Sequence, residues 1–177
     1  MNGTTIMWAV TIVFTALAGS VVAYVFQNRS WVFQQQKRIR DEQVASLSKT
    51  VERLSAAIFR RIAITEVLLA ALKSNDRSRI EKAANDYNSS IVSFNVDIRE
   101  SLPILVREDY ASGSERIATI EKDIVSQLAM IGSRLDNIVI KDITIKSTEI
   151  SELSSRLRYI NHMSFNIIRD IYRDMQN

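Results

Sequence analysis

The sequence predicts an all-α protein, with one N-terminal transmembrane helix followed by an antiparallel four-helix bundle. Only four glycines, one proline and no cysteine occur in its 177 residues, too few for the tight turns of a sheet-rich fold. Residues 1–28 carry no charged side chain. Beyond them, apolar residues recur every three or four positions, which is the period of an amphipathic helix.

The N-terminal segment predicts a membrane anchor at residues 1–28. Residues 5–26 form a 22-residue run without charge. As a helix this run would be about 33 Å long, enough to cross a hydrocarbon core of about 30 Å. Trp8 near one end, with Tyr24 and Trp31 near the other, is typical of the aromatic residues found at membrane interfaces.

Two other interpretations of this segment are a cleaved signal peptide and a buried core helix. Residues 16–18 have the A-x-A form of a cleavage site, but no basic region precedes the apolar run, which also continues beyond residue 18. A helix without a polar face would be hard to cover in so small a domain. Both alternatives are therefore less favoured than a transmembrane anchor.

Residues 29–43 predict a basic juxtamembrane segment that continues into a helix. Lys and Arg flanking a span mark its cytoplasmic side, so we expect an inner (plasma) membrane protein with its N-terminus outside and its bundle in the cytoplasm. The same basic side chains can contact anionic lipid headgroups. The predicted contacts with the membrane surface are Arg29, Trp31, Lys37, Arg38 and Arg40.

Small residues within the predicted span indicate self-association. Ala16 and Ser20, and likewise Gly19 and Ala23, are four positions apart, the spacing that lets two helix backbones approach in lipid. We therefore expect a homo-oligomer that forms through this face.

Residues 44–177 predict the bundle through four apolar stripes. Short links force neighbouring helices to run in opposite directions. The main alternative is three long helices in an antiparallel coiled-coil arrangement, with residues 114–177 as one helix. Residues 139–147 could either form a turn or continue a helix. A turn near residues 141–142 is preferred. The stripes are Val44, Leu47, Val51, Leu54, Ile58, Ile62, Leu69 and Leu72; Ile80, Ala84, Tyr87, Ile91, Phe94, Ile98 and Leu102; Ile117, Ile120, Ile124, Leu128, Ile131, Leu135 and Ile138; and Ile150, Leu153, Leu157, Ile160, Ser164, Ile167 and Ile171.

Local signals predict where the helices end. Residues 74–76 break the first stripe, and Ser78 with Glu81 has the spacing of a capping box. Pro103 lacks an N–H and is expected to end or kink the second helix. Gly132 lies inside a helical pattern, where it would allow close contact between helices.

The composition argues against enzymes and nucleic-acid-binding proteins. The only histidine is His162, and no cysteine is present; no G-x-S-x-G elbow or glycine-rich phosphate loop occurs either. We therefore predict no catalytic, metal or cofactor residues. A net charge of +3 without a dense basic patch does not favour nucleic acid.

Arginines beside the first apolar stripe are the remaining candidates for a site. With a turn near residues 75–76, Arg53 would lie level with Asp97 and form an ion pair between helices. Arg60 and Arg61 would lie near residues 90–91, where either is a candidate contact for a small anion. The simpler interpretation is an arginine whose stem covers the seam while its head reaches water.

These features predict a non-enzymatic, single-pass membrane protein that acts as a scaffold or interaction module for protein partners at the membrane. The sequence does not identify the partner. An extracytoplasmic four-helix-bundle module that senses a ligand through Arg60 or Arg61 is one alternative. An oligomeric membrane pore component is another.

Overall fold

The computed structural model describes residues 3–108, 114–141 and 145–175, and the side chains of residues 24, 26–107, 116–141 and 145–175. In these ranges every element is helical and no strand occurs. The chain divides into two compact units, Met1–Ala45 and Ser46–Asn177. The fold class is therefore all-α, as predicted.

Helix α1 (Gly3–Ser74) contains the backbone of the predicted anchor and also the first helix of the second unit. Within unit Met1–Ala45, the described side chains are all exposed, including Tyr24, Phe26 and Trp31. Burial begins in the second unit, where Val51 and Leu54 are completely buried. Val44, placed on the first predicted stripe, is 39% exposed.

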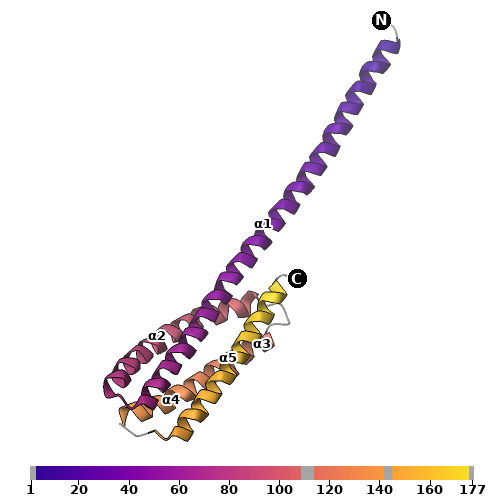
Figure 1. Cartoon of the computed structure of the whole chain (residues 1–177). Helices are drawn as coiled ribbons and strands as arrows, with labels where there is room; N and C mark the ends of the chain where they lie inside the picture. The colour runs from indigo at the N-terminus through magenta and orange to yellow at the C-terminus, as the bar shows by residue number, and fades with distance from the viewer. Residues whose placement is uncertain (1–2, 109–113, 142–144, 176–177) are drawn as a thin grey trace. The chain divides into compact units, whose positions relative to one another are not determined.

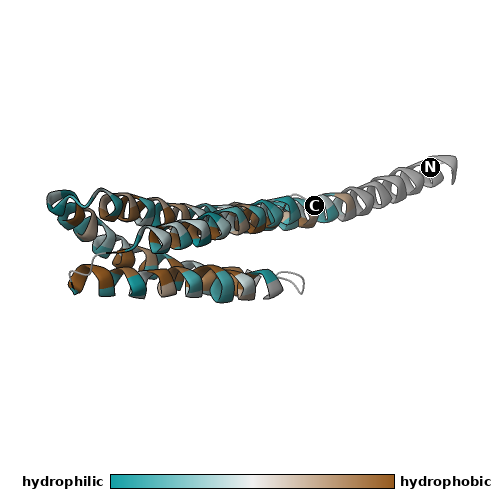
Figure 2. Ribbon diagram, turned by 60° about the horizontal axis from the view of Figure 1, so that its bottom comes forward, coloured by the Kyte–Doolittle hydropathy of each residue, from teal (hydrophilic) through white to brown (hydrophobic). Residues whose placement is uncertain are grey.

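The second unit is an antiparallel helical bundle (Figure 1). Residues 46–74 of α1 are followed by α2 (Arg77–Glu108), by a stretch made of α3 (Ser114–Thr119), the π-helical turn η1 (Ile120–Val125) and α4 (Ser126–Ile140), and by α5 (Ser147–Met175). One hydrophobic core joins residues from all of these elements. In Figure 2, hydrophobic and hydrophilic residues alternate along each bundle helix, the pattern of helices with one buried face.

Ion pairs join residues that the antiparallel order brings level on neighbouring helices. Arg53 of α1 pairs with Asp97 of α2 at 2.8 Å, and Arg134 of α4 pairs with Glu149 of α5 at 2.9 Å. The Arg53–Asp97 pair is the one predicted from the position of the first turn. Arg53 also reaches Glu100 at 2.6 Å.

The first turn lies where the sequence predicts it, but its cap is a different residue. Asn75 adopts a left-handed conformation with φ of 54°, which asparagine tolerates. Asp76 then caps α2, because its Oδ1 accepts the backbone N–H groups of Ser78 at 3.1 Å and Arg79 at 3.3 Å. The capping box expected from Ser78 and Glu81 is wrong, because α2 already begins at Arg77 and the Ser78 N–H donates to Asp76 Oδ1 instead.

Pro103 does not end α2, which continues to Glu108. Its side chain is exposed, so the Arg99 carbonyl that loses its N–H donor can turn to water instead. The spacing of Ser112 and Glu115 also predicts a capping box, but Ser112 lies outside the described residues.

The separation of α4 from α5 rules out the three-helix alternative. Helix α4 ends at Ile140, Lys141 forms a turn, and α5 begins at Ser147, so residues 114–177 are not one helix. The π-helical turn was not predicted. There the backbone N–H of Ser126 donates to the carbonyl of Glu121, and its hydroxyl donates to the same oxygen at 3.0 Å.

Candidate functional site

The predicted residues of the membrane surface lie on α1 in unit Met1–Ala45. Arg29, Trp31, Lys37, Arg38 and Arg40 are all exposed. Arg38 forms an ion pair with Glu42 one turn later, at 2.9 Å. The other three basic residues have no ion pair within the described part of the chain.

The predicted span itself lies mostly outside the described side chains. Among the residues that the structure describes, no helix is both long and apolar enough to cross a bilayer. Of residues 5–26, the side chains of only Tyr24 and Phe26 are described. The structure likewise does not describe the side chains proposed for self-association, which are Ala16, Gly19, Ser20 and Ala23.

Arg60 and Arg61 differ sharply in their surroundings. The Arg60 side chain is exposed, in keeping with a solvated arginine at the edge of the seam. Arg61 is only 4% exposed and points into the bundle. Its contacts with Tyr87 and Ser90 confirm the register predicted from the first turn.

The Arg61 guanidinium is held by α2. Its Nη1 donates to the backbone carbonyl of Tyr87 at 3.1 Å and to Ser90 Oγ at 2.9 Å. The guanidinium carbon also lies 3.9 Å from the centroid of the Tyr87 ring, a cation–π contact that partly offsets the loss of hydration. No carboxylate among the described residues forms an ion pair with it, and burial lowers the pKa of Arg61.

Gly132 lets Arg61 and Tyr87 pack closely against α4. Together with Ser90, these two residues form the Arg61 cluster. A Cβ added there would lie 2.8 Å from the Tyr87 hydroxyl and 3.3 Å from Arg61 Nη2. Any side chain would therefore displace one of these groups. The prediction that Gly132 permits close helix contact is confirmed.

The Tyr87 hydroxyl is buried without a hydrogen-bond partner in the described part of the chain. The residue is 1% exposed, and burial raises its pKa to about 12, although the Arg61 charge acts in the opposite direction. The hydroxyl is therefore neutral at physiological pH.

A cavity of about 360 Å³ adjoins the Arg61 cluster between α1, α2 and the η1–α4 stretch. Its polar lining consists of Arg61, Asn95, Ser133, Asp136 and Asn137. Asp136 is half-buried, and its carboxylate makes no hydrogen bond or ion pair within the described ranges. The apolar lining is Ile91, Phe94, Val125, Leu128, Ala129 and Ile140.

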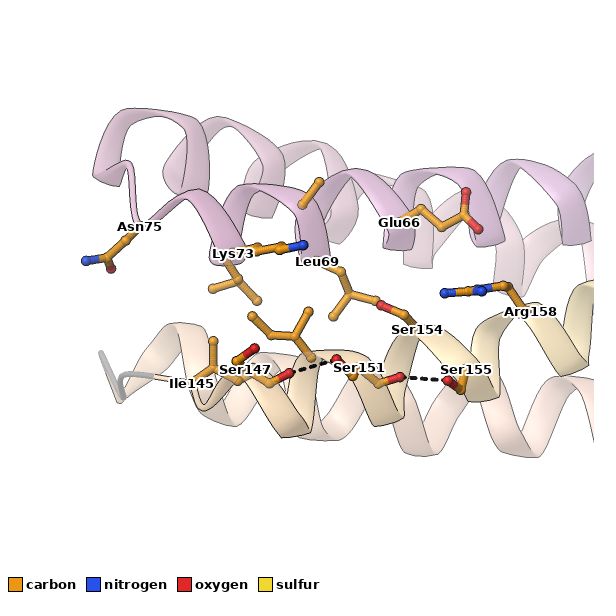
Figure 3. A pocket seen from close by; sticks show the side chains of 13 residues that line it. Glu66, Leu69, Lys73, Asn75, Ile145, Ser147, Ser151, Ser154, Ser155 and Arg158 are labelled. Atoms are coloured by element: carbon orange, nitrogen blue, oxygen red, sulfur yellow. Dashed lines mark hydrogen bonds between the residues drawn. The ribbon is translucent and has the colours of Figure 1, made fainter.

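A second, larger hollow lies between α1 and α5 at the turn end of the bundle and measures about 790 Å³. Figure 3 shows Arg158 from α5 directing its charged end into the space between the helices, and Lys73 of α1 lines the same hollow. Serines line the α5 side, but Ser151 and Ser155 donate to carbonyls one turn earlier, at 3.0 and 2.8 Å. Its two cations are exposed, so they remain in contact with solvent.

The described residues contain no cluster of His, Asp or Glu that could hold a metal ion. His162 is exposed on α5 and lies 3.0 Å from the Asn166 amide.

Sequence reasoning identified Arg61 and its register with residues 90–91, and it predicted close helix contact at Gly132, but it assigned no role to Tyr87, Ser90 or Asp136. Tyr87 lay on an apolar stripe and Asp136 beside one, so both looked like ordinary helix residues. The register across the first turn, which places Arg61 opposite residue 90, is the signal that could have connected Arg61 with Tyr87 and Ser90. Placing α4 beside that level required the tertiary structure.

Comparison with known proteins adds no assignment: no protein-family model, no curated protein and no solved structure matches this chain.

Proposed function

We propose that the protein is a membrane-tethered, non-enzymatic helical bundle that serves as a scaffold or interaction module for protein partners. In this proposal residues 5–26 cross the inner membrane with the N-terminus outside. Arg29, Trp31 and the basic residues at 37, 38 and 40 lie at the cytoplasmic surface, and the bundle is cytoplasmic.

The observation that carries the proposal is the order of features along α1. A charge-free run of membrane-spanning length, an exposed basic segment and the first helix of a separately cored bundle follow one another within a single helix. The basic segment also supports the orientation, because Lys and Arg are retained on the cytoplasmic side.

Tethering supplies the mechanism. Confinement near one membrane surface raises the effective concentration of the bundle for any partner held at the same surface. Association through the face made by Ala16, Gly19, Ser20 and Ala23 would add copies of the bundle at one place, since such faces promote helix pairing in lipid.

Cysteine labelling tests the anchor and its orientation, because the natural chain contains no cysteine. In intact cells a membrane-impermeant maleimide should label N2C, whereas S155C on exposed α5 should react only after permeabilisation. Labelling of S155C in intact cells would reverse the proposed orientation. Release of the unmodified protein by alkaline carbonate would overturn the anchor itself.

A matched pair of arginine substitutions tests the span. L17R places a charge at its centre, where insertion costs about 2.5–3.5 kcal/mol, and should shift protein from the membrane to the soluble fraction. Q35R adds the same charge to the exposed basic segment and should leave the distribution unchanged.

The second candidate function is ligand sensing by the bundle. A specific observation favours it, since Arg61 is buried, forms no ion pair with a carboxylate in the described ranges and lines a cavity. In the extracytoplasmic form of this candidate, S155C would be labelled in intact cells.

A further inference from the structure

The cavity beside Arg61 is lined by two opposite charges that attract each other without forming an ion pair. Arg61 and Asp136 both line it, yet no ion pair joins them, and neither is paired with another charged residue in the described part of the chain. A buried charge without a partner is costly. The cavity therefore presents a buried cation and a half-buried anion, neither held in an ion pair, to whatever occupies it.

The guanidinium retains donors for such an occupant. Nη1 donates to the Tyr87 carbonyl and to Ser90 Oγ, and both of these acceptors are neutral. Nη2 faces Gly132, which also lines the cavity. The missing Cβ at residue 132 keeps this edge of Arg61 uncovered on the cavity side.

Asp136 is one helical turn beyond Gly132, so the two residues share a face of α4. Its half-buried carboxylate can accept hydrogen bonds from a cationic group. The Asn95 and Asn137 side chains add neutral polar groups to the same lining, whereas side chains from α2, η1 and α4 form an apolar wall.

We propose that this cavity binds a small zwitterion of the α-amino-acid class, whose carboxylate meets Arg61, whose ammonium meets Asp136 and whose apolar side chain packs on the wall that includes Phe94 and Leu128. A simple anion would satisfy Arg61 but face Asp136, and a simple cation would have the reverse problem. The volume of about 360 Å³ lies at the small end of ligand sites, which span about 300–1,000 Å³.

This inference deepens the ligand-sensing candidate and does not depend on membrane topology. Cysteine labelling reports only the orientation, and calorimetry reports only the site, so failure of one leaves the other standing.

The test is isothermal titration of the full-length protein, purified in mild detergent, with L-leucine and with 4-methylpentanoate, which is leucine without its ammonium group. Leucine should bind more tightly than 4-methylpentanoate. In D136N the affinity for leucine should fall by about tenfold or more, the usual effect of one charge-assisted hydrogen bond. The affinity for 4-methylpentanoate should stay equal or rise.

Two further variants locate the binding. R61M should abolish binding of both ligands, and D136N keeps the proposal testable if R61M fails to fold. R158Q removes an exposed cation from the other hollow (Figure 3) and should change neither affinity.

Three results would overturn the proposal. One is the absence of binding with leucine and with phenylalanine at millimolar concentration. Another is leucine binding that D136N leaves intact. The third is binding that R158Q removes and D136N does not, which would place the ligand between α1 and α5.

Discussion

The contact between Gly132 and Tyr87 makes a double-mutant cycle the sharpest test of the packing around Arg61. In G132A, the new methyl group would lie 2.8 Å from the Tyr87 hydroxyl oxygen. The ring is 1% exposed and has little room to move, so the crowding should cost about 1–3 kcal/mol, as overpacking does. Alanine regains about 1 kcal/mol of helix propensity over glycine. The net expectation is a loss of about 1 kcal/mol.

The second arm of the cycle removes the obstructing oxygen. Y87F keeps the ring beneath Arg61 and deletes a buried hydroxyl that has no partner in the described ranges. Leaving such a group unsatisfied costs about 1–3 kcal/mol, so Y87F should stabilise the bundle by about 1 kcal/mol. In that background G132A should stabilise too, because only the contact with Arg61 Nη2 at 3.3 Å remains.

The expected coupling free energy is therefore about 2 kcal/mol. The assay is urea unfolding of the full-length protein. Unfolding is monitored by hydrogen–deuterium exchange of peptides from residues 46–74 and 126–140. Tryptophan fluorescence would not serve, since Trp8 and Trp31 both precede the second unit. Additive effects, with a coupling below about 0.5 kcal/mol, would refute the close approach of Gly132 to Tyr87.

Three other predictions concern the bundle alone. Burial raises the pKa of Tyr87 to about 12, so the folded state keeps the hydroxyl proton to a higher pH than the unfolded chain does. The free energy of unfolding should therefore fall as pH rises from about 10 to 12. Thermal melts of Y87F should show a smaller fall. D76A removes the acceptor of the Ser78 and Arg79 N–H groups and should cost about 1 kcal/mol in urea unfolding, whereas S78A should cost less than half as much. L157A deletes a completely buried side chain and should cost about 2–5 kcal/mol; a smaller loss would contradict its place in the core.

The sequence determined the helical class and the core stripes because both depend on local periodicity. Leu54, Ile124 and Leu157 are buried where a period of three and four places them. The first turn followed from the break at residues 74–76, and that turn set the pairing of Arg53 with Asp97. Near the end of the fourth stripe the prediction was one residue off, since Ile168 is buried and Ile167 is only half-buried.

The tertiary structure alone decided which helix faces Arg61. Periodicity shows that a residue lies on a buried stripe, but it does not show which stripe lies opposite. Only the packing of α4 against α1 and α2 brings Gly132 to the Tyr87 hydroxyl and places Asp136 in the same cavity as Arg61. The charges of that cavity come from residues 61 and 136, which are far apart in the chain, so no local pattern could have joined them.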